Sequence, residues 1–109
     1  MASIQDAVFS FFVEEASDHL GVLEAGLLEL ETAGSVSSEE MDTLFRAAHT
    51  LKGSASLVKM SSVGEISHRM EDLFESVRDG KLLVTPSHVD ALLFSLDQIK
   101  ELIRLKSEG

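Results

Sequence analysis

Apolar residues recur at intervals of three, four or seven along most of this chain, and no other feature constrains the fold as strongly. That spacing places them on one face of a helix. In the first segment, residues 4–32, the face is formed by Phe12, Ala16, Leu23, Leu27 and Leu30. No segment alternates apolar and polar residues for long enough to form a strand, and tyrosine and tryptophan are absent. The pattern predicts an all-α protein.

A second helix is expected after the loop at residues 34–37. Ser37 and Glu40 have the spacing of a capping box, so this helix should begin at Ser38 and run to about Val58. Its apolar stripe is Met41, Leu44, Phe45, Ala48, Leu51 and Ala55.

Two more helices complete the pattern. Ser62 and Glu65 have the spacing of another capping box, at the start of a third helix predicted over 63–79. Asp79-Gly80 should end this helix. Thr85-Pro86 places an N-cap and a first-turn proline at the start of the fourth. The two stripes are Val63, Ile66, Met70, Leu73 and Val77, then Val89, Leu92, Leu96, Ile99 and Ile103. With short connections in 109 residues, the chain should fold as one antiparallel up-down four-helix bundle.

The charge is unevenly distributed. Nine basic and 19 acidic residues give a net charge of −10, which argues against a nucleic-acid or membrane-surface binder. Residues 1–45 hold ten acids and no lysine or arginine, and the basic residues begin at Arg46. Two interpretations remain open at this point. The first helix has a solvated acidic face, or positive charge is gathered around something just after residue 45.

Composition also limits the chemistry and the compartment. Cysteine is absent, which excludes disulfides, thiolate metal sites and a cysteine nucleophile. No apolar run approaches the roughly 20 residues that span a bilayer, and the N-terminus lacks the basic start of a signal peptide. We therefore expect a cytoplasmic protein.

His49 has unusual neighbours on its helix. Arg46 lies three residues before His49, and Lys52 lies three residues after it. Gly53 lies four residues after His49, about one helical turn away on the same surface strip. Glycine destabilises a helix interior, so its presence needs a reason. An open surface beside a histidine and two cations would suit a phosphoryl group. Alternatively, Gly53 permits close helix packing and Lys52 lies at the edge of the core.

The third helix offers His68 and Glu71 on one face. Glu71 lies about 100° from the centre of the predicted apolar stripe, so it can face His49 across a groove. A carboxylate that accepts a hydrogen bond from Nδ1–H would leave Nε2 as the nucleophile. The alternative is an ordinary solvated glutamate.

The segment from Phe45 to Ala55, FRAAHTLKGSA, resembles the phospho-accepting motif of histidine phosphotransfer (HPt) domains. The likeness continues through HRMEDL at 68–73 and VRDGK at 77–81, and FVEEA at 12–16 resembles the family's first helix. Within the family, the chain is most similar to the N-terminal HPt domain of CheA-type chemotaxis histidine kinases. Ser54 departs from the pattern, since many members have a second glycine there.

The resemblance implies a role for each matching residue. His49 would be phosphorylated on Nε2, Glu71 would orient its ring, Lys52 would face the phosphoryl oxygens, and His68 would join the same network. Arg46 and Gly53 would lie on the surface that binds partners.

The implied function is that of a phosphorelay carrier. A kinase ATP-binding domain would phosphorylate the histidine, and an aspartate of a response-regulator receiver domain would take the group. ATP and Mg²⁺ would belong to those partners, with no cofactor or metal in this chain, which also lacks a G-x-x-x-x-G-K-[ST] motif. Residues 1–109 would be a single domain excised from the N-terminus of a larger CheA-like kinase. Many such domains add a fifth helix after the fourth.

Two other functions stay open on the sequence alone. A stand-alone or degenerate HPt bundle would act only as a docking module, although the motif residues are intact. A di-iron bundle would need two Glu-x-x-His motifs, and Glu65 with His68 supplies one.

Overall fold

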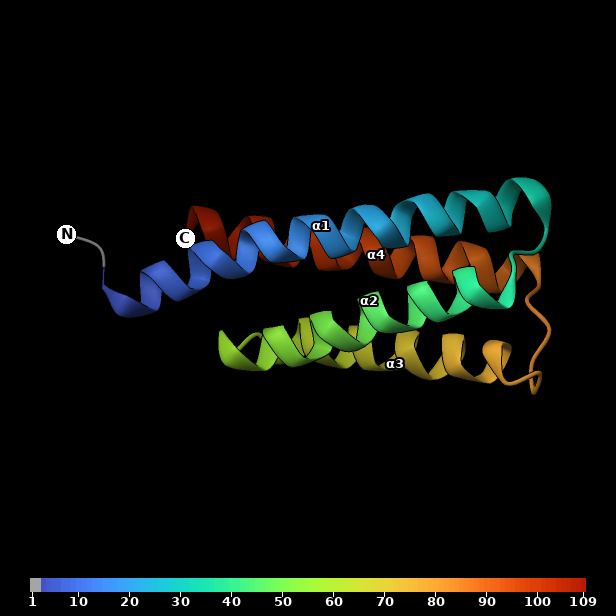
Figure 1. Ribbon diagram of the computed structural model, residues 1–109. Coiled ribbons are helices and arrows are strands. Elements are labelled where there is room, and N and C mark those ends of the chain that lie inside the picture. The colour runs from blue at the N-terminus through green and yellow to red at the C-terminus, as the bar shows by residue number, and fades with distance from the viewer. Residues whose placement is uncertain (1–2) are drawn as a thin grey trace.

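The computed structural model describes residues 3–109, which form four helices joined by short loops (Figure 1). The helices are α1 (Ile4–Ala33), α2 (Ser38–Leu57), α3 (Ser61–Arg78) and α4 (Pro86–Glu108). No strand occurs among residues 3–109. The bundle measures 49 × 21 × 19 Å, and the start of α1 lies at the same end of it as the end of α4 (Figure 1). The predicted all-α up-down bundle is confirmed.

Three of the four helices begin with a reciprocal capping box. The side chains of Ser3, Ser37 and Thr85 each accept a hydrogen bond from the backbone N–H three residues on, and that third residue bonds back to the cap. The two caps predicted at Ser37 and Thr85 are therefore confirmed. Gly34 and Gly80 follow α1 and α3 with φ angles of 81° and 76°, a left-handed conformation that favours glycine.

The start of α3 differs from the prediction. This helix begins at Ser61 after Met60, which makes no side-chain capping bond, so the capping box expected from Ser62 and Glu65 is wrong. The reason is the tight turn before it. Lys59 adopts a left-handed φ of 57°, and the Met60 N–H donates to the Ala55 carbonyl at 3.0 Å. The chain thus reverses and enters α3 before Ser62 can act as a cap.

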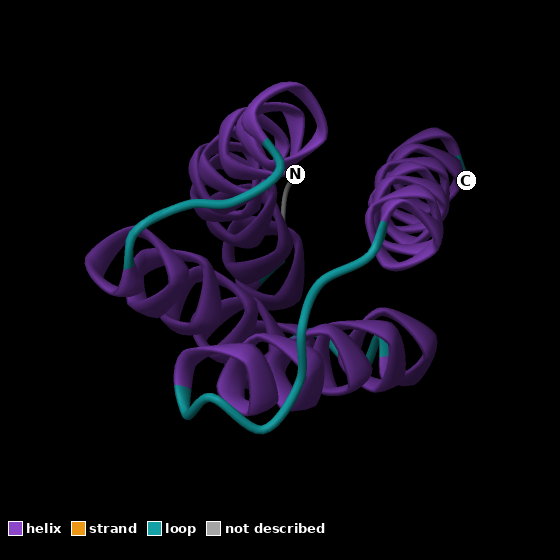
Figure 2. Ribbon diagram, turned by 90° about the vertical axis from the view of Figure 1, so that its right-hand side faces the viewer, coloured by secondary structure: helices purple, strands orange, loops and turns teal. Residues whose placement is uncertain are grey.

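The four helices surround one apolar core (Figure 2). The stripes predicted for α1 and α4 are buried in full. In α3, however, Ile66, Leu73 and Val77 are only half-buried. Ser67, Glu71 and Phe74 take buried positions together with the predicted Val63 and Met70. The inward face of α3 is therefore rotated from the predicted stripe, and it includes a carboxylate.

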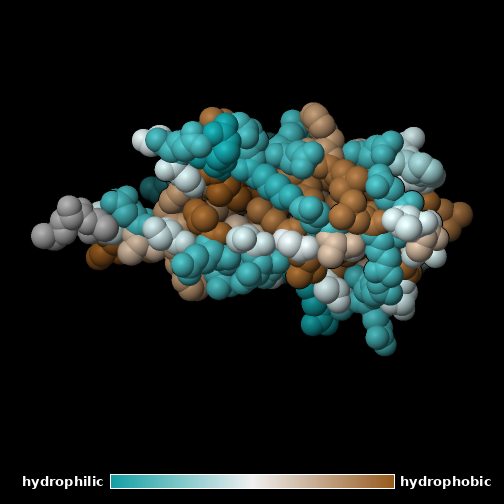
Figure 3. Space-filling model, turned by 90° about the horizontal axis from the view of Figure 1, so that it is seen from above, coloured by the Kyte–Doolittle hydropathy of each residue, from teal (hydrophilic) through white to brown (hydrophobic). Residues whose placement is uncertain are grey.

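The helix pairs differ in how closely they approach. Between α1 and α2, Gly26 packs against the side chain of Leu44, and a Cβ added there would overlap that side chain unless Leu44 shifts. Between α1 and α4 lies a groove of about 530 Å³, lined in part by Val13, Leu20 and Ile103. Figure 3 shows apolar side chains between rows of polar ones on this side of the bundle. In the part of the chain that the structure describes, no helix is both long and apolar enough to cross a membrane.

Candidate functional site

His49 lies on the flank of α2, and 61% of its side chain is exposed. Its Nδ1 pairs with Oε2 of Glu71, which reaches across from α3. The other oxygen of this carboxylate, Oε1, accepts a hydrogen bond from Nζ of Lys52 at 2.8 Å. One carboxylate from α3 thus holds two nitrogen atoms from α2, as the sequence predicted for Glu71 and His49.

The environment of Glu71 is more enclosed than its predicted position implied. Only 8% of its side chain is exposed, so the alternative of a solvated glutamate is wrong. Burial raises the pKa of Glu71, but hydrogen bonds and charge from Lys52 and His49 outweigh it and hold the pKa below its ordinary value. Glu71 is therefore a carboxylate at neutral pH, able to accept both bonds.

This pairing determines which nitrogen of the imidazole is free. A carboxylate accepts a hydrogen bond, so Nδ1 of His49 carries the proton that it donates to Glu71. In the neutral ring, Nε2 then carries the lone pair. Because the side chain is mostly exposed, a reagent arriving from solvent can reach this nitrogen. The arrangement presents a nucleophile with a buried carboxylate behind it.

Gly53 lies one helical turn from His49 and is exposed. A Cβ added there would meet no atom of residues 3–109 within 4 Å, apart from its immediate neighbours and its own helix backbone. The alternative that Gly53 permits close helix packing is therefore wrong. Its missing side chain leaves open surface beside the imidazole. Arg46, on the other side of His49, is exposed and pairs with Asp42 at 2.8 Å.

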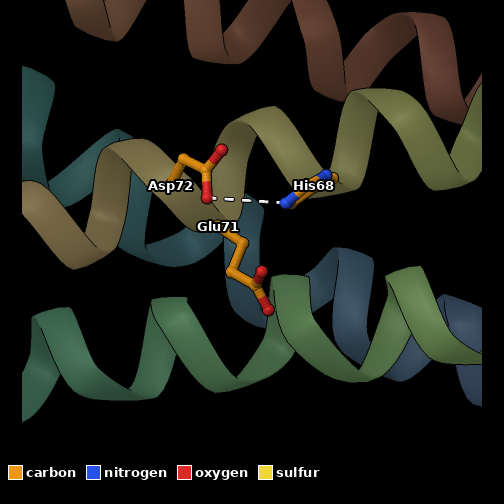
Figure 4. Close-up of side chains that lie close together, drawn as sticks. All are labelled: His68, Glu71 and Asp72. Atoms are coloured by element: carbon orange, nitrogen blue, oxygen red, sulfur yellow. Dashed lines mark ion pairs between the residues drawn. The ribbon is translucent and has the colours of Figure 1, made fainter.

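His68 is near this network but bonds elsewhere. Its Nε2 lies 3.6 Å from Oδ1 of Asp72, and both side chains are exposed on α3. In Figure 4 these two residues face each other along α3, whereas Glu71 points toward α2. Among residues 3–109, His68 makes no hydrogen bond or ion pair with Glu71 or His49, so the expected shared network is not formed.

His68, Glu71 and Asp72 also bring one ligand atom each to within 4.8 Å of one another. A cation there would compete for Glu71 with His49 and Lys52, which already occupy both carboxylate oxygens. Glu65, the other half of the predicted Glu-x-x-His motif, does not belong to this group.

The remaining two histidines lie outside the site. His88 is in the first turn of α4, and its Nδ1 accepts a hydrogen bond from the Thr85 backbone N–H at 3.0 Å. His19 is half-buried on α1.

Two residues near the site were not predicted to be part of it. The ring of Phe45 stacks on His49, and the guanidinium of Arg78 lies over Phe45. The only local signal was the spacing of Phe45 and His49, which are four residues apart in one helix.

A four-helix bundle that presents an exposed histidine, held at Nδ1 by a buried carboxylate beside a lysine, has the architecture of a histidine phosphotransfer domain. The chain belongs to the Hpt domain family, whose model matches residues 7–104.

Among members of this family, the chain is similar to part of the chemotaxis protein CheA from several organisms. The chain is 39% identical over 104 residues to the chemotaxis protein CheA of Borreliella burgdorferi, covering 95% of this chain and 12% of that protein. It is 38% identical over 98 residues to CheA of Treponema pallidum, covering 90% and 12%. The chain thus spans about an eighth of the length of these relatives.

A solved structure extends the likeness to three dimensions. The CheA phosphotransferase domain from Thermotoga maritima superposes with a TM-score of 0.86 at 28% identity, covering 97% of this chain and 99% of that one. The predicted resemblance to the HPt domain of CheA-type kinases is confirmed.

Proposed function

We propose that this domain carries a phosphoryl group on Nε2 of His49, between the ATP-binding domain of a CheA-like kinase and an aspartate of a receiver domain. The observation that carries the proposal is the pairing of His49 Nδ1 with the buried Glu71, which leaves Nε2 free on an exposed side chain. Membership of the Hpt family supports the same assignment, because the segment around His49 resembles the family's phospho-accepting motif.

In the first step, the lone pair of Nε2 attacks the γ-phosphorus of ATP held by the kinase domain. The N–P bond forms, the bond from phosphorus to the bridging oxygen breaks, and ADP leaves. Positive charge develops on the imidazole, and the carboxylate of Glu71 stabilises it through Nδ1–H. Lys52 lies one turn from His49 and supplies positive charge beside the transferred oxygens.

In the second step, a carboxylate oxygen of the receiver aspartate attacks the same phosphorus. The O–P bond forms, the N–P bond breaks, and its electron pair returns to Nε2. The partners supply Mg²⁺ and ATP in this scheme, and the present chain supplies the nucleophile and its orientation. Gly53 and Arg46 lie on either side of His49, where both partners would have to approach.

The same proposal extends to the whole protein. Residues 1–109 would be the phosphotransfer domain at the N-terminus of a larger CheA-like kinase, because the matched relatives are about eight times longer. The domain would act in the cytoplasm, where the partner kinase domain finds ATP.

Phosphorylation mapping tests the assignment. The domain is incubated with radiolabelled ATP and the ATP-binding portion of a CheA-type kinase, and separately with phosphoramidate, whose N–P bond breaks as ammonia leaves. We expect acid-labile phosphate on His49 by mass spectrometry, complete loss in His49→Gln, and full labelling of His19→Gln as the matched control. Phosphate on another histidine, or none with either donor, would contradict the proposal.

A further inference from the structure

The imidazole of His49 has a second contact besides Glu71. Its ring stacks on Phe45, which precedes it by one turn of α2, with ring centroids 6.0 Å apart and an angle of 20° between the planes. This separation is within the range in which offset aromatic rings attract each other. Glu71 holds the edge of the imidazole, and Phe45 lies against its face.

Phe45 in turn lies under a cation. The guanidinium carbon of Arg78 is 4.3 Å from the centroid of the Phe45 ring, well within the distance for a cation–π contact. Arg78 is the last residue of α3, so this contact joins the end of α3 to the face of α2 that carries His49. Phe45 itself is half-buried.

Two carboxylates hold Arg78 in place. Its Nη1 donates to Asp42 at 3.1 Å and its Nε donates to Asp79 at 3.2 Å. Asp42 also pairs with Arg46 at 2.8 Å. A guanidinium bonded at two of its nitrogens has little freedom to turn, so it presents a fixed plane to the ring below it.

We infer that Phe45 and Arg78 are positioning residues for His49: the phenyl ring limits rotation of the imidazole, and the clamped guanidinium fixes the phenyl ring. A single bond at Nδ1 permits the imidazole to swing about that bond, which would swing Nε2 through an arc. Contact along the ring face removes this freedom, so the lone pair of Nε2 keeps one direction. An aligned nucleophile reacts faster than a mobile one. The inference rests on the proposed phosphorylation of His49.

Three variants test the two contacts. Phe45→Leu keeps an apolar side chain but removes the ring, Phe45→Tyr restores a ring face, and Arg78→Met keeps the stem but removes the cation. The readouts are the ring-proton chemical shifts of His49 by NMR, which a stacked phenyl ring displaces, and the rate of phosphorylation by phosphoramidate, which needs no protein partner.

We expect Phe45→Leu to abolish the ring-current displacement at His49 and to slow phosphorylation about two- to tenfold, the effect of one aromatic pair on a barrier. Phe45→Tyr should recover both. Arg78→Met should give a smaller change in the same direction. The matched controls are Phe94→Leu and Arg104→Met on α4, where Phe94 is exposed and Arg104 pairs with Glu101 and Glu108. Neither control should alter His49.

Unchanged His49 shifts and an unchanged rate in folded Phe45→Leu would overturn the inference and leave the proposed function standing. Absence of His49 phosphorylation in the wild type would instead remove the proposed function, whatever the shifts show. If Phe45→Leu does not fold, the same measurements on Arg78→Met decide, and His49 shifts and a rate equal to those of wild type then refute the role inferred for Arg78 and overturn the inference as stated.

Discussion

The two long sides of the bundle use the same kinds of residue with different results. Between α2 and α3, one buried carboxylate, Glu71, bonds to a histidine and a lysine of the other helix. Between α1 and α4, Glu24 pairs with Lys100 at the edge of an open groove, and both side chains are about half exposed. Exposed pairs contribute little to stability, whereas a buried group loses more when its partner is removed. Cross-helix pairing alone therefore does not mark a site, but burial of the shared carboxylate does.

Glycines show the same contrast. Gly21 lines the α1–α4 groove, and Gly53 lies beside His49. Within residues 3–109, beyond its own helix and neighbours, an added Cβ at either position would meet nothing within 4 Å. Gly26, by contrast, is pressed against Leu44. Such an open glycine does not serve internal packing, and of these two only Gly53 lies beside His49.

The largest difference between the two sides should appear with a bulky residue at these open glycines. Gly53→Gln should fold but block both receipt of the phosphoryl group from a kinase domain and its donation to a receiver, because the side chain fills the surface beside His49. Gly21→Gln is the matched control and should transfer normally. The measurement is labelled-phosphate transfer in both directions, with circular dichroism to check folding. Normal transfer by folded Gly53→Gln would place the docking surface elsewhere.

The next largest effect concerns the two carboxylates. Glu71→Ala should slow phosphorylation of His49 by about one to two orders of magnitude, since a hydrogen bond to a charged group is worth about 1.5–3 kcal/mol. The fold should persist, because Lys52 is partly exposed and can turn to solvent. Glu24→Ala on the other side should leave the rate unchanged. Nitrogen NMR of His49 adds a second measurement, and an unaltered tautomer together with an unaltered rate in Glu71→Ala would remove Glu71 from the site.

Replacing Gly21, Gly26 and Gly53 by alanine should show, in the free energy of unfolding, which glycine is needed for packing and which ones only lower helix propensity. Gly53→Ala and Gly21→Ala should each raise the free energy of unfolding by up to about 1 kcal/mol, since each adds a helix-favouring residue in open space. Gly26→Ala gains the same propensity but forces a methyl group into buried Leu44, at a cost of about 1–3 kcal/mol, so a net loss is expected. Urea unfolding measures all three. A gain at Gly26 would mean that Leu44 moves aside freely.

Much of this molecule could be predicted because its signals are local. The buried stripes of α1 and α4 follow from periodicity within each helix, and the caps at Ser37 and Thr85 depend on residues three positions apart. His49, Lys52 and Gly53 lie within two turns of one helix. The pairing of His49 with α3 depends on how two helices face each other, which periodicity alone does not determine. Glu71 could still be predicted as the partner, because it is an acidic residue at the flank of the apolar stripe.

The parts that could not be predicted depend on contacts between distant residues. Periodicity assigns buried positions to apolar residues, so it placed Leu73 inward and Glu71 at the flank, whereas Glu71 is buried because two groups of α2 bond to it. Arg78 lies 33 positions after Phe45, and nothing near either residue indicates their contact. The Ser62–Glu65 pair had the right spacing for a cap, but the left-handed turn at Lys59 had already begun the helix.

The smallest effect expected concerns the pH dependence of stability, which should change when Lys52 is replaced but not when Lys100 is replaced. The pKa of Glu71 is held below its ordinary value of 4.5, so its ionised form stabilises the fold above that pH, and this contribution is lost as the pH falls through the lowered pKa. Lys52→Met removes one cause of the shift while burial, which raises the pKa, remains. The Glu71 pKa should therefore rise, so the loss of stability that Glu71 causes on acidification should become smaller and should end at a higher pH. The carboxyl carbon shift of Glu71 by NMR, with urea unfolding across the acid range, measures both. Lys100→Met, on the α1–α4 side, should leave the titration of Glu71 where it is in the wild type. If Lys52→Met also leaves it there, the bond from Lys52 contributes nothing to the ionisation of Glu71, and His49 alone must offset its burial.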